Sequence, residues 1–220
     1  LADRGARVVI GPQSSSEVAA ISDQAGARGV ILVSQGSTAS SLAQPDDSVF
    51  RFVPTDRVEG RASVDLMLRN GAETIVPMWR NDRGNTGLAD SVRAAATASG
   101  ATVSPGVVYE PDTTDFTTSL NDLSGQLQSL VAKAGADKVA VYLAGFEEVA
   151  DVLSTARTVT GIDGVRWYGG DGSAQTKALL ASGPATFATM AKVKGYPSPL
   201  VALPADQAKK DADLLGQISK

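Results

Sequence analysis

The run VVIGPQSSSE at residues 8–17 sets the architecture of the chain. Its first three residues are β-branched and Gly11-Pro12 follows them, which predicts a buried strand that ends in a turn. Ser14 and Glu17 then have the spacing of a capping box, which predicts a helix that begins here and continues to about Ala27. A strand that passes directly into a helix is the repeating unit of parallel α/β sheets.

The same alternation continues along the chain. Further strands are predicted at residues 30–33, 50–53, 74–78, 102–109, 138–143, 165–168 and 190–193. Helical patterns fall at residues 56–70, 88–99, 116–134, 149–156, 175–180 and 205–218. The sequence therefore predicts an α/β fold with parallel sheets and helices on both faces of each sheet. Because such sheets bind ligands beyond the carboxyl ends of their strands, loops 11–16, 34–38, 80–86, 144–148 and 169–173 are the candidate site.

The composition excludes several classes of function. The chain has a formal net charge of −4 and no basic stripe, which argues against nucleic acid as a partner. It has no Cys and no His, so thiol nucleophiles, Ser-His triads, disulfides and the usual zinc sites are excluded. We therefore expect no enzymatic activity, no metal and no cofactor. The chain begins without Met or a signal peptide, so we expect its N-terminus to be a truncation or processing product.

Two loops on consecutive strands carry hydroxyl groups. Ser14-Ser15-Ser16 lies where a strand passes into a helix, and a helix N-terminus offers free amides and partial positive charge to an anion. Gly36-Ser37-Thr38 ends the next strand, where glycine allows a ligand close to the backbone and Thr38 adds a hydroxyl. The alternative is that both loops only cap helices, because Ser and Thr are common caps.

Two later loops carry acidic and aromatic groups. In Gly169-Gly170-Asp171-Gly172, a carboxylate between glycines suits an ammonium or hydroxyl ligand, although an Asp-Gly turn is the simpler interpretation. In residues 145–148, Phe146 suits the wall of a cleft. Glu147 and Glu148 suit acid–base chemistry, but we prefer to interpret them as a favourable pair in the first turn of a helix.

These loops resemble, in order and separation, those of the periplasmic binding proteins for branched-chain amino acids. The resemblance is carried by residues 8–16 and 29–39, then by Phe50-Arg51-Phe52, by residues 87–92, by Thr114-Asp115-Phe116 and by the glycine loops at 145 and 169. It covers about residues 5 to 193. It implies a type I periplasmic-binding-protein fold of two Rossmann-like lobes, with residues 1–54 and part of 194–220 in the first lobe and residues 55–193 in the second.

The resemblance also implies roles for individual residues. The hydroxyls and amides of Ser15 and Thr38 would hold the α-carboxylate of an amino acid, with Ser37 in the same loop. The Gly36 carbonyl, the Thr38 hydroxyl and Asp171 would receive the α-ammonium. Phe146 would stand in for an aromatic side chain that the second lobe brings to the cleft.

The chain departs from the family pattern in two ways. Gly84 stands where the family has an aromatic residue, which predicts that one apolar wall of the pocket is absent or polar. The chain also lacks the segment with which the family's first lobe begins. We therefore expect an incomplete first lobe with exposed apolar surface.

The resemblance implies a solute-binding protein of an ABC importer. Such a protein captures an amino acid or similar small carboxylate outside the cytoplasm, in the periplasm or at the cell exterior, and presents it to a membrane permease. Hinges are expected at residues 53–56 and 194–197. One alternative is a sensory or regulatory ligand-binding domain of the same fold. Another is an α/β enzyme that uses Ser15, which lacks a recognisable base.

Overall fold

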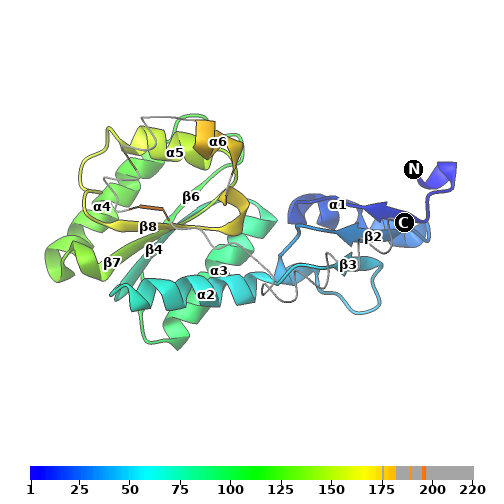
Figure 1. Cartoon of the computed structure of the whole chain (residues 1–220), viewed down its shortest axis with the longest axis horizontal. Helices are drawn as coiled ribbons and strands as arrows, with labels where there is room; N and C mark the ends of the chain where they lie inside the picture. Colours follow the sequence, from blue (N-terminus) through cyan, green and yellow to red (C-terminus); the bar gives the residue numbers. More distant parts are fainter. Residues whose placement is uncertain (175, 182–188, 190–194, 197–220) are drawn as a thin grey trace, which may run out of the picture.

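A computed structural model of the protein describes residues 1–174, 176–181, 189 and 195–196, and it shows two lobes (Figure 1). The first lobe consists of η1 (Ala2–Arg4), β1 (Val8–Ile10), α1 (Ser15–Ala27), β2 (Ile31–Ser34), η2 (Ser40–Leu42) and β3 (Val49–Arg51). The second lobe consists of α2 (Asp56–Arg69), β4 (Thr74–Arg80), α3 (Arg83–Ala98), β5 (Thr102–Val103), β6 (Val107–Tyr109), α4 (Thr117–Ala134), η3 (Ala136–Lys138), β7 (Val139–Ala144), α5 (Val149–Ala156), β8 (Arg166–Gly169), η4 (Asp171–Ser173) and α6 (Lys177–Ala181). The predicted strand at 190–193, the predicted helix at 205–218 and the first-lobe share of 194–220 lie outside the described residues.

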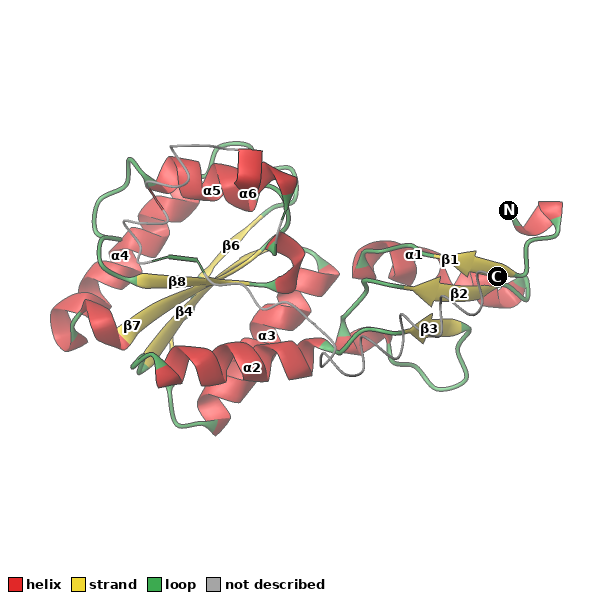
Figure 2. Ribbon diagram, viewed as in Figure 1, coloured by secondary structure: helices red, strands yellow, loops and turns green. Residues whose placement is uncertain are grey.

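The second lobe is built on a parallel sheet of five strands. β4 and β7 occupy its centre, with β5 and β6 beside β4 and β8 beside β7. Helices α2 and α3 cover one face and α4 and α5 the other (Figure 2). Because strand side chains alternate, Ile75 packs towards α2 and α3 while Val76 and Met78 pack towards α4 and α5. The predicted parallel sheet with two covered faces is confirmed for this lobe.

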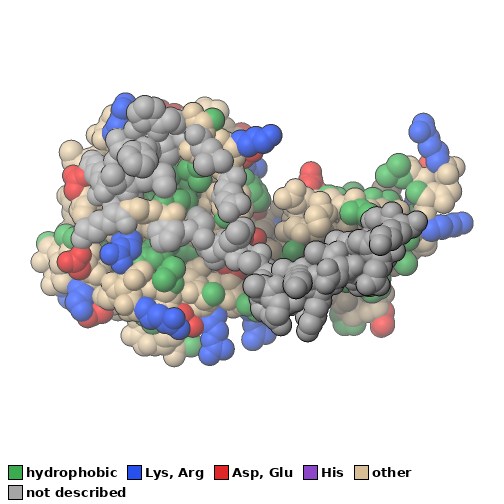
Figure 3. All heavy atoms as spheres, in the orientation of Figure 1, with side chains coloured by type: hydrophobic (Ala, Val, Ile, Leu, Met, Phe, Trp, Pro, Cys, Tyr) green, Lys and Arg blue, Asp and Glu red, His purple; other side chains and the backbone are tan. Residues whose placement is uncertain are grey.

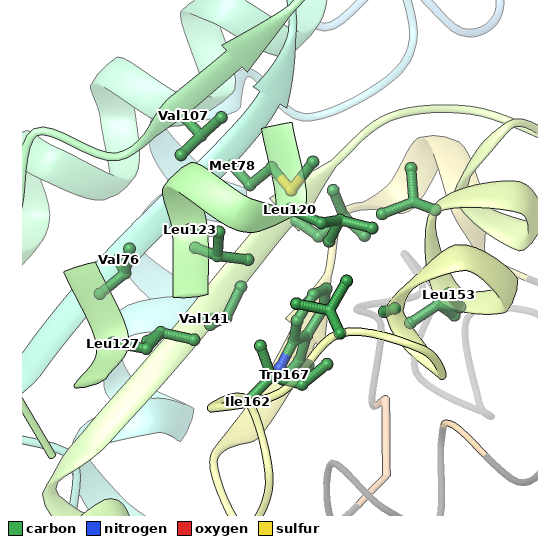
Figure 4. Packing of buried hydrophobic residues seen from close by; sticks show 14 of the residues in the cluster. Val76, Met78, Val107, Leu120, Leu123, Leu127, Val141, Leu153, Ile162 and Trp167 are labelled. Carbon is green, nitrogen blue, oxygen red and sulfur yellow. The ribbon is translucent and has the colours of Figure 1, made fainter. Parts of the chain in front are cut away.

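Trp167 lies at the centre of the larger core of the second lobe (Figure 4). It is fully buried, and the apolar stripe expected on the helix at 116–134 packs beside it through Leu120, Leu123 and Leu127 of α4. Burial of each such side chain contributes about 1.5–3 kcal/mol, so this face of the sheet supplies much of the stability of the lobe.

The first lobe has a parallel sheet of three strands in the order β1-β2-β3. On one face, Val18 of α1 packs with Ala39 and Leu42. The other face bears apolar side chains that are 53–81% exposed at Val8, Ile10, Phe50 and Phe52. In the described part of the chain, helices therefore cover this sheet on one face, as the prediction of an incomplete first lobe requires.

Two elements differ from the sequence-based prediction. The strand expected over 102–109 is two strands, because Pro105 lacks an amide for the ladder and Gly106 has a φ of 76°. The turn at Gly106 lets the chain pair twice with β4. The expected loop at 80–86 is cut short because Asp82 caps α3, which already begins at Arg83; the Asp82 carboxylate accepts from the Asn85 amide at 3.0 Å.

Candidate functional site

A cleft of about 610 Å³ lies between the two lobes. In the space-filling view, a notch is visible between the larger second lobe and the smaller first lobe (Figure 3). The first lobe lines the cleft with the loops that follow β1 and β2, and the second lobe with those that follow β4, β7 and β8. The five loops nominated from the sequence therefore meet at one place.

Of the six residues predicted to bind a ligand, five line this cleft: Ser15, Gly36, Thr38, Phe146 and Asp171. Ser37 does not, because its side chain is fully buried in the first lobe. Its amide donates to Ser34 Oγ at 3.1 Å and its carbonyl accepts from Arg51 Nη1 at 3.4 Å. Ser37 therefore supports the loop from within.

Hydrogen bonds fix the two hydroxyl loops to each other. Ser15 Oγ accepts from the Ala39 amide at 3.2 Å, and Ser34 Oγ donates to the Pro12 carbonyl at 2.6 Å. Within the described residues, the amides of Ser15 and Thr38 donate no hydrogen bond. These two loops consequently bring two amides without a partner in the described residues and two hydroxyl groups to the cleft, and an anion can accept hydrogen bonds from such groups.

The N-termini of α1 and α3 meet across the cleft. The Arg83 amide, the first of α3, donates to Ser16 Oγ at 3.2 Å, and Arg83 Nη1 donates to Ser41 Oγ at 3.2 Å. A Cβ on Gly84 would lie 3.5 Å from Ser15 Oγ, so a larger side chain here would occupy the space beside that hydroxyl. The predicted absence of a wall at position 84 thus leaves Ser15 open to the cleft.

The second lobe contributes acidic groups to the cleft. Asp171, which lines the cleft, follows β8, and its amide donates to Glu59 Oε1 at 2.8 Å from α2. Asp56, one turn before Glu59, is fully buried beside the Thr38 hydroxyl. Three carboxyl groups from two segments of the second lobe therefore gather at the cleft and directly behind its lining.

Burial governs the protonation of this acidic group. Loss of water raises the pKa of Glu59 to about 8, and the nearby charge of Asp171 acts in the same direction. Burial also raises the pKa of Asp171 and that of Asp56, although the Thr38 hydroxyl near Asp56 favours its ionised form. The group therefore retains a proton near neutral pH and favours a cation beside it.

Asp56 and Glu59 were missed in the sequence, where they read as ordinary acids in the first turn of a helix. One signal was available in Gly87, a glycine inside a helix. A Cβ on Gly87 would lie 2.6 Å from Asp56 Oδ2, so glycine there permits the approach of α3 to the buried carboxylate. A glycine in the interior of a helix, where no turn requires it, often marks a position at which another segment packs closely against the helix.

Phe146 is held at the cleft by a network behind it. Its amide donates to Glu148 Oε1 at 3.1 Å, and Tyr109 Oη donates to the same oxygen at 3.0 Å. Arg80 lies 3.5 Å from Glu148 and 3.1 Å from Asp82, with its guanidinium 5.4 Å from the Phe146 ring centre. Both residues stand at the start of α5, but their surroundings differ: Glu148 is a structural anchor, whereas its neighbour Glu147 lines the cleft.

The described residues contain neither a membrane-spanning helix nor a metal-binding cluster. No helix in this part of the chain has the length and apolar character needed to cross a membrane. The acidic side chains of the same residues form no cluster of three or more suited to holding a metal ion.

Known proteins similar to this chain are solute-binding proteins and one protein of unknown activity. A leucine-binding protein, LivK, from Thermotoga maritima is 24% identical with a TM-score of 0.67; the match covers 83% of this chain and 49% of that one. LivJ from Streptococcus pneumoniae, the substrate-binding protein of a branched-chain amino-acid transporter solved with isoleucine, is 25% identical with a TM-score of 0.62, over 77% and 45% of the two chains. An uncharacterized protein of Methanocaldococcus jannaschii is 27% identical over 183 residues, which are 80% of this chain and 43% of that protein.

This chain therefore spans less than half the length of each of these three proteins. Its two lobes of parallel sheet and helix correspond to the type I periplasmic-binding-protein fold. The sequence matches the receptor family ligand binding region over residues 2–197. The chain thus belongs to that family of ligand-binding receptors.

Proposed function

We propose that this chain is the solute-capturing part of an extracytoplasmic binding protein of an ABC importer, and that it holds an amino acid or a similar small carboxylate. The observation that carries the proposal is that groups of both polarities line the cleft. Ser15 and Thr38 supply amides that donate no hydrogen bond within the described residues, and Asp171 supplies a carboxylate. A zwitterion is complementary to both kinds of group at once.

Each predicted binding residue then has a role. Ser15 and Thr38 hold the α-carboxylate, while Asp171, the Gly36 carbonyl and the Thr38 hydroxyl receive the α-ammonium. Phe146 forms an apolar wall. Gly36 suits its position because Gln13 lies against it, where a Cβ would come within 2.5 Å of Gln13 Cγ. The ligand is bound without chemical change, so the protein is not an enzyme in this proposal.

Capture couples to closure of the lobes about the linker at residues 53–56 and a second linker at 194–197, of which the structure describes Gly195 and Tyr196. A membrane permease then takes the ligand from the closed form. This setting places the protein in the periplasm or outside the cell. The named activities of LivK and LivJ, which bind leucine and serve a branched-chain amino-acid transporter, support the proposal.

Isothermal titration calorimetry against a panel of amino acids tests the proposal. We expect Ser15→Ala and Thr38→Val each to weaken the binding of the best ligand by about 1–3 kcal/mol, which corresponds to roughly fivefold to 150-fold, because each removes a hydrogen bond to a charged group. Thr38→Ser keeps the hydroxyl and should bind nearly as the parent does.

Ser129→Ala is the matched control, because Ser129 is an exposed serine on α4, away from the cleft. Circular dichroism establishes that each variant is folded. If the folded parent binds no member of the panel, the proposed function is wrong. If it binds but both Ser15→Ala and Thr38→Val retain full affinity, the assignment of these residues is wrong.

A further inference from the structure

The cleft lining carries formal negative charge on both lobes. Glu17 comes from the first lobe, and Glu147 and Asp171 come from the second. Among the described lining residues there is no Lys and no Arg. A cleft with this lining concentrates cations and repels anions, and the net charge of −4 on the whole chain acts in the same direction.

Three arginines lie close to the cleft, but none of them lines it. Arg80 is paired with Asp82 and Glu148 behind Phe146. Arg83 donates its Nη1 to Ser41 Oγ and Arg51 donates to the Ala39 carbonyl, so both of these guanidinium groups are hydrogen-bonded to the first lobe.

The acids lie at two levels. Asp171 forms the inner level, with Glu59 and the fully buried Asp56 behind it. Glu17 and Glu147 form the outer level, where both side chains are exposed. A simple zwitterion brings one ammonium, which the inner level takes up, and leaves the outer pair uncompensated.

Glu17 and Glu147, the outer pair, interact electrostatically from opposite lobes. Glu17 accepts from the Ser14 hydroxyl at 2.9 Å as part of a helix cap, and the Glu147 side chain has no hydrogen bond or ion pair within the described residues. Because the two carboxylates stand on opposite lobes, closure of the cleft increases their repulsion. A cation between them reverses the sign of that interaction.

We propose that the ligand is an amino acid with a cationic side chain, of the lysine or arginine class, whose side-chain charge lies between Glu17 and Glu147. This inference rests on the proposed function and names its substrate class. The methylenes of such a side chain pack on Leu88 and Phe146, which are apolar residues of the cleft lining. Acidic amino acids are rejected by the same carboxylates.

Calorimetry with L-arginine, L-lysine, L-leucine and L-glutamate at low and at physiological salt tests the inference on the whole chain. We expect arginine or lysine to bind at least about tenfold more tightly than leucine, glutamate to show no binding, and the preference for the cation to shrink with salt. Glu17→Gln and Glu147→Gln should each weaken arginine binding by about three- to tenfold and leave leucine unchanged, because they remove one partly exposed charge. Glutamine at position 17 retains the helix cap.

Glu73→Gln is the matched control. It removes the same charge at the start of β4, the end of that strand remote from the cleft, where Glu73 pairs with Lys138. Tight leucine binding with weak arginine binding overturns this inference and leaves the proposed function standing. Arginine binding that neither variant weakens overturns the placement of the cation. If no amino acid binds to the folded protein, both the inference and the proposed function fall.

Discussion

The two lobes carry the same kind of parallel sheet, but they differ in how it is covered. In the second lobe, every residue of β7 is buried between helices on both faces. In the first lobe, α1 covers one face, and Ile10 and Phe52 are 80% and 81% exposed on the other. Parallel sheets normally need both faces covered, so the second lobe supplies the stable core.

The cleft nevertheless draws equally on both lobes. Both lobes hold their binding groups with hydrogen bonds, such as that from the Ala39 amide to Ser15 Oγ in the first lobe and that from the Phe146 amide to Glu148 in the second. The lobes differ in the core beneath these groups, which is small in the first lobe and large in the second, so core variants in each lobe should behave differently.

The largest expected effect is in the core of the second lobe. Trp167→Ala should lower the free energy of unfolding by about 3–5 kcal/mol, because it leaves a cavity at a fully buried position. Urea unfolding followed by circular dichroism measures this. The contrasting variant is Phe52→Ala in the first lobe, which should change stability by less than about 0.5 kcal/mol. Equal losses from the two variants would break the comparison.

A smaller effect on the free energy of unfolding is expected from the buried acids of the second lobe, and it depends on pH. Glu59 binds a proton more tightly in the folded chain than in the unfolded one, since its pKa rises from 4.5 to about 8. The folded state therefore holds more protons between these two values, and stability should fall as pH rises through that window. Glu59→Gln, which resembles the protonated acid, should flatten this slope in urea titrations from pH 5 to pH 8.5.

The exposed Glu73→Gln should leave that slope as it is in the parent. A parent whose unfolding midpoint is the same throughout this pH range would contradict the assignment of the proton to Glu59.

The smallest expected change in stability lies on the open face of the first lobe. Ile10→Ser with Phe50→Ser should alter the free energy of unfolding by less than about 1 kcal/mol, because both side chains are already more than half exposed. The same double variant should bind much less of a hydrophobic dye such as ANS. Leu66→Ser, at a 42% exposed position on α2, is the control and should leave dye binding nearly unchanged.

Local patterns predicted most of this architecture, and long-range contacts account for what they missed. The capping box at Ser14 and Glu17 formed as expected, because both partners lie within one helical turn. The place of Glu59 in the acidic group of the cleft could not be predicted from local patterns, since its hydrogen-bond partner Asp171 lies 112 residues further along the chain. Helix α3 was predicted to begin too late because the capping residue Asp82 lies among polar residues that resemble a loop.

The hydrogen bond from the Asp171 amide to Glu59 also has a consequence for the order of folding. Glu59 stands near the start of the second lobe and Asp171 just after β8, so this contact closes a loop that contains the five described strands of the lobe. Contacts of such sequence separation are slow to form and depend on the structure between them. During synthesis, the acidic group of the cleft can be completed only after β8 has joined the sheet, whereas the serine loops have long since emerged. Ligand binding to both kinds of group would therefore report a second lobe that has finished folding.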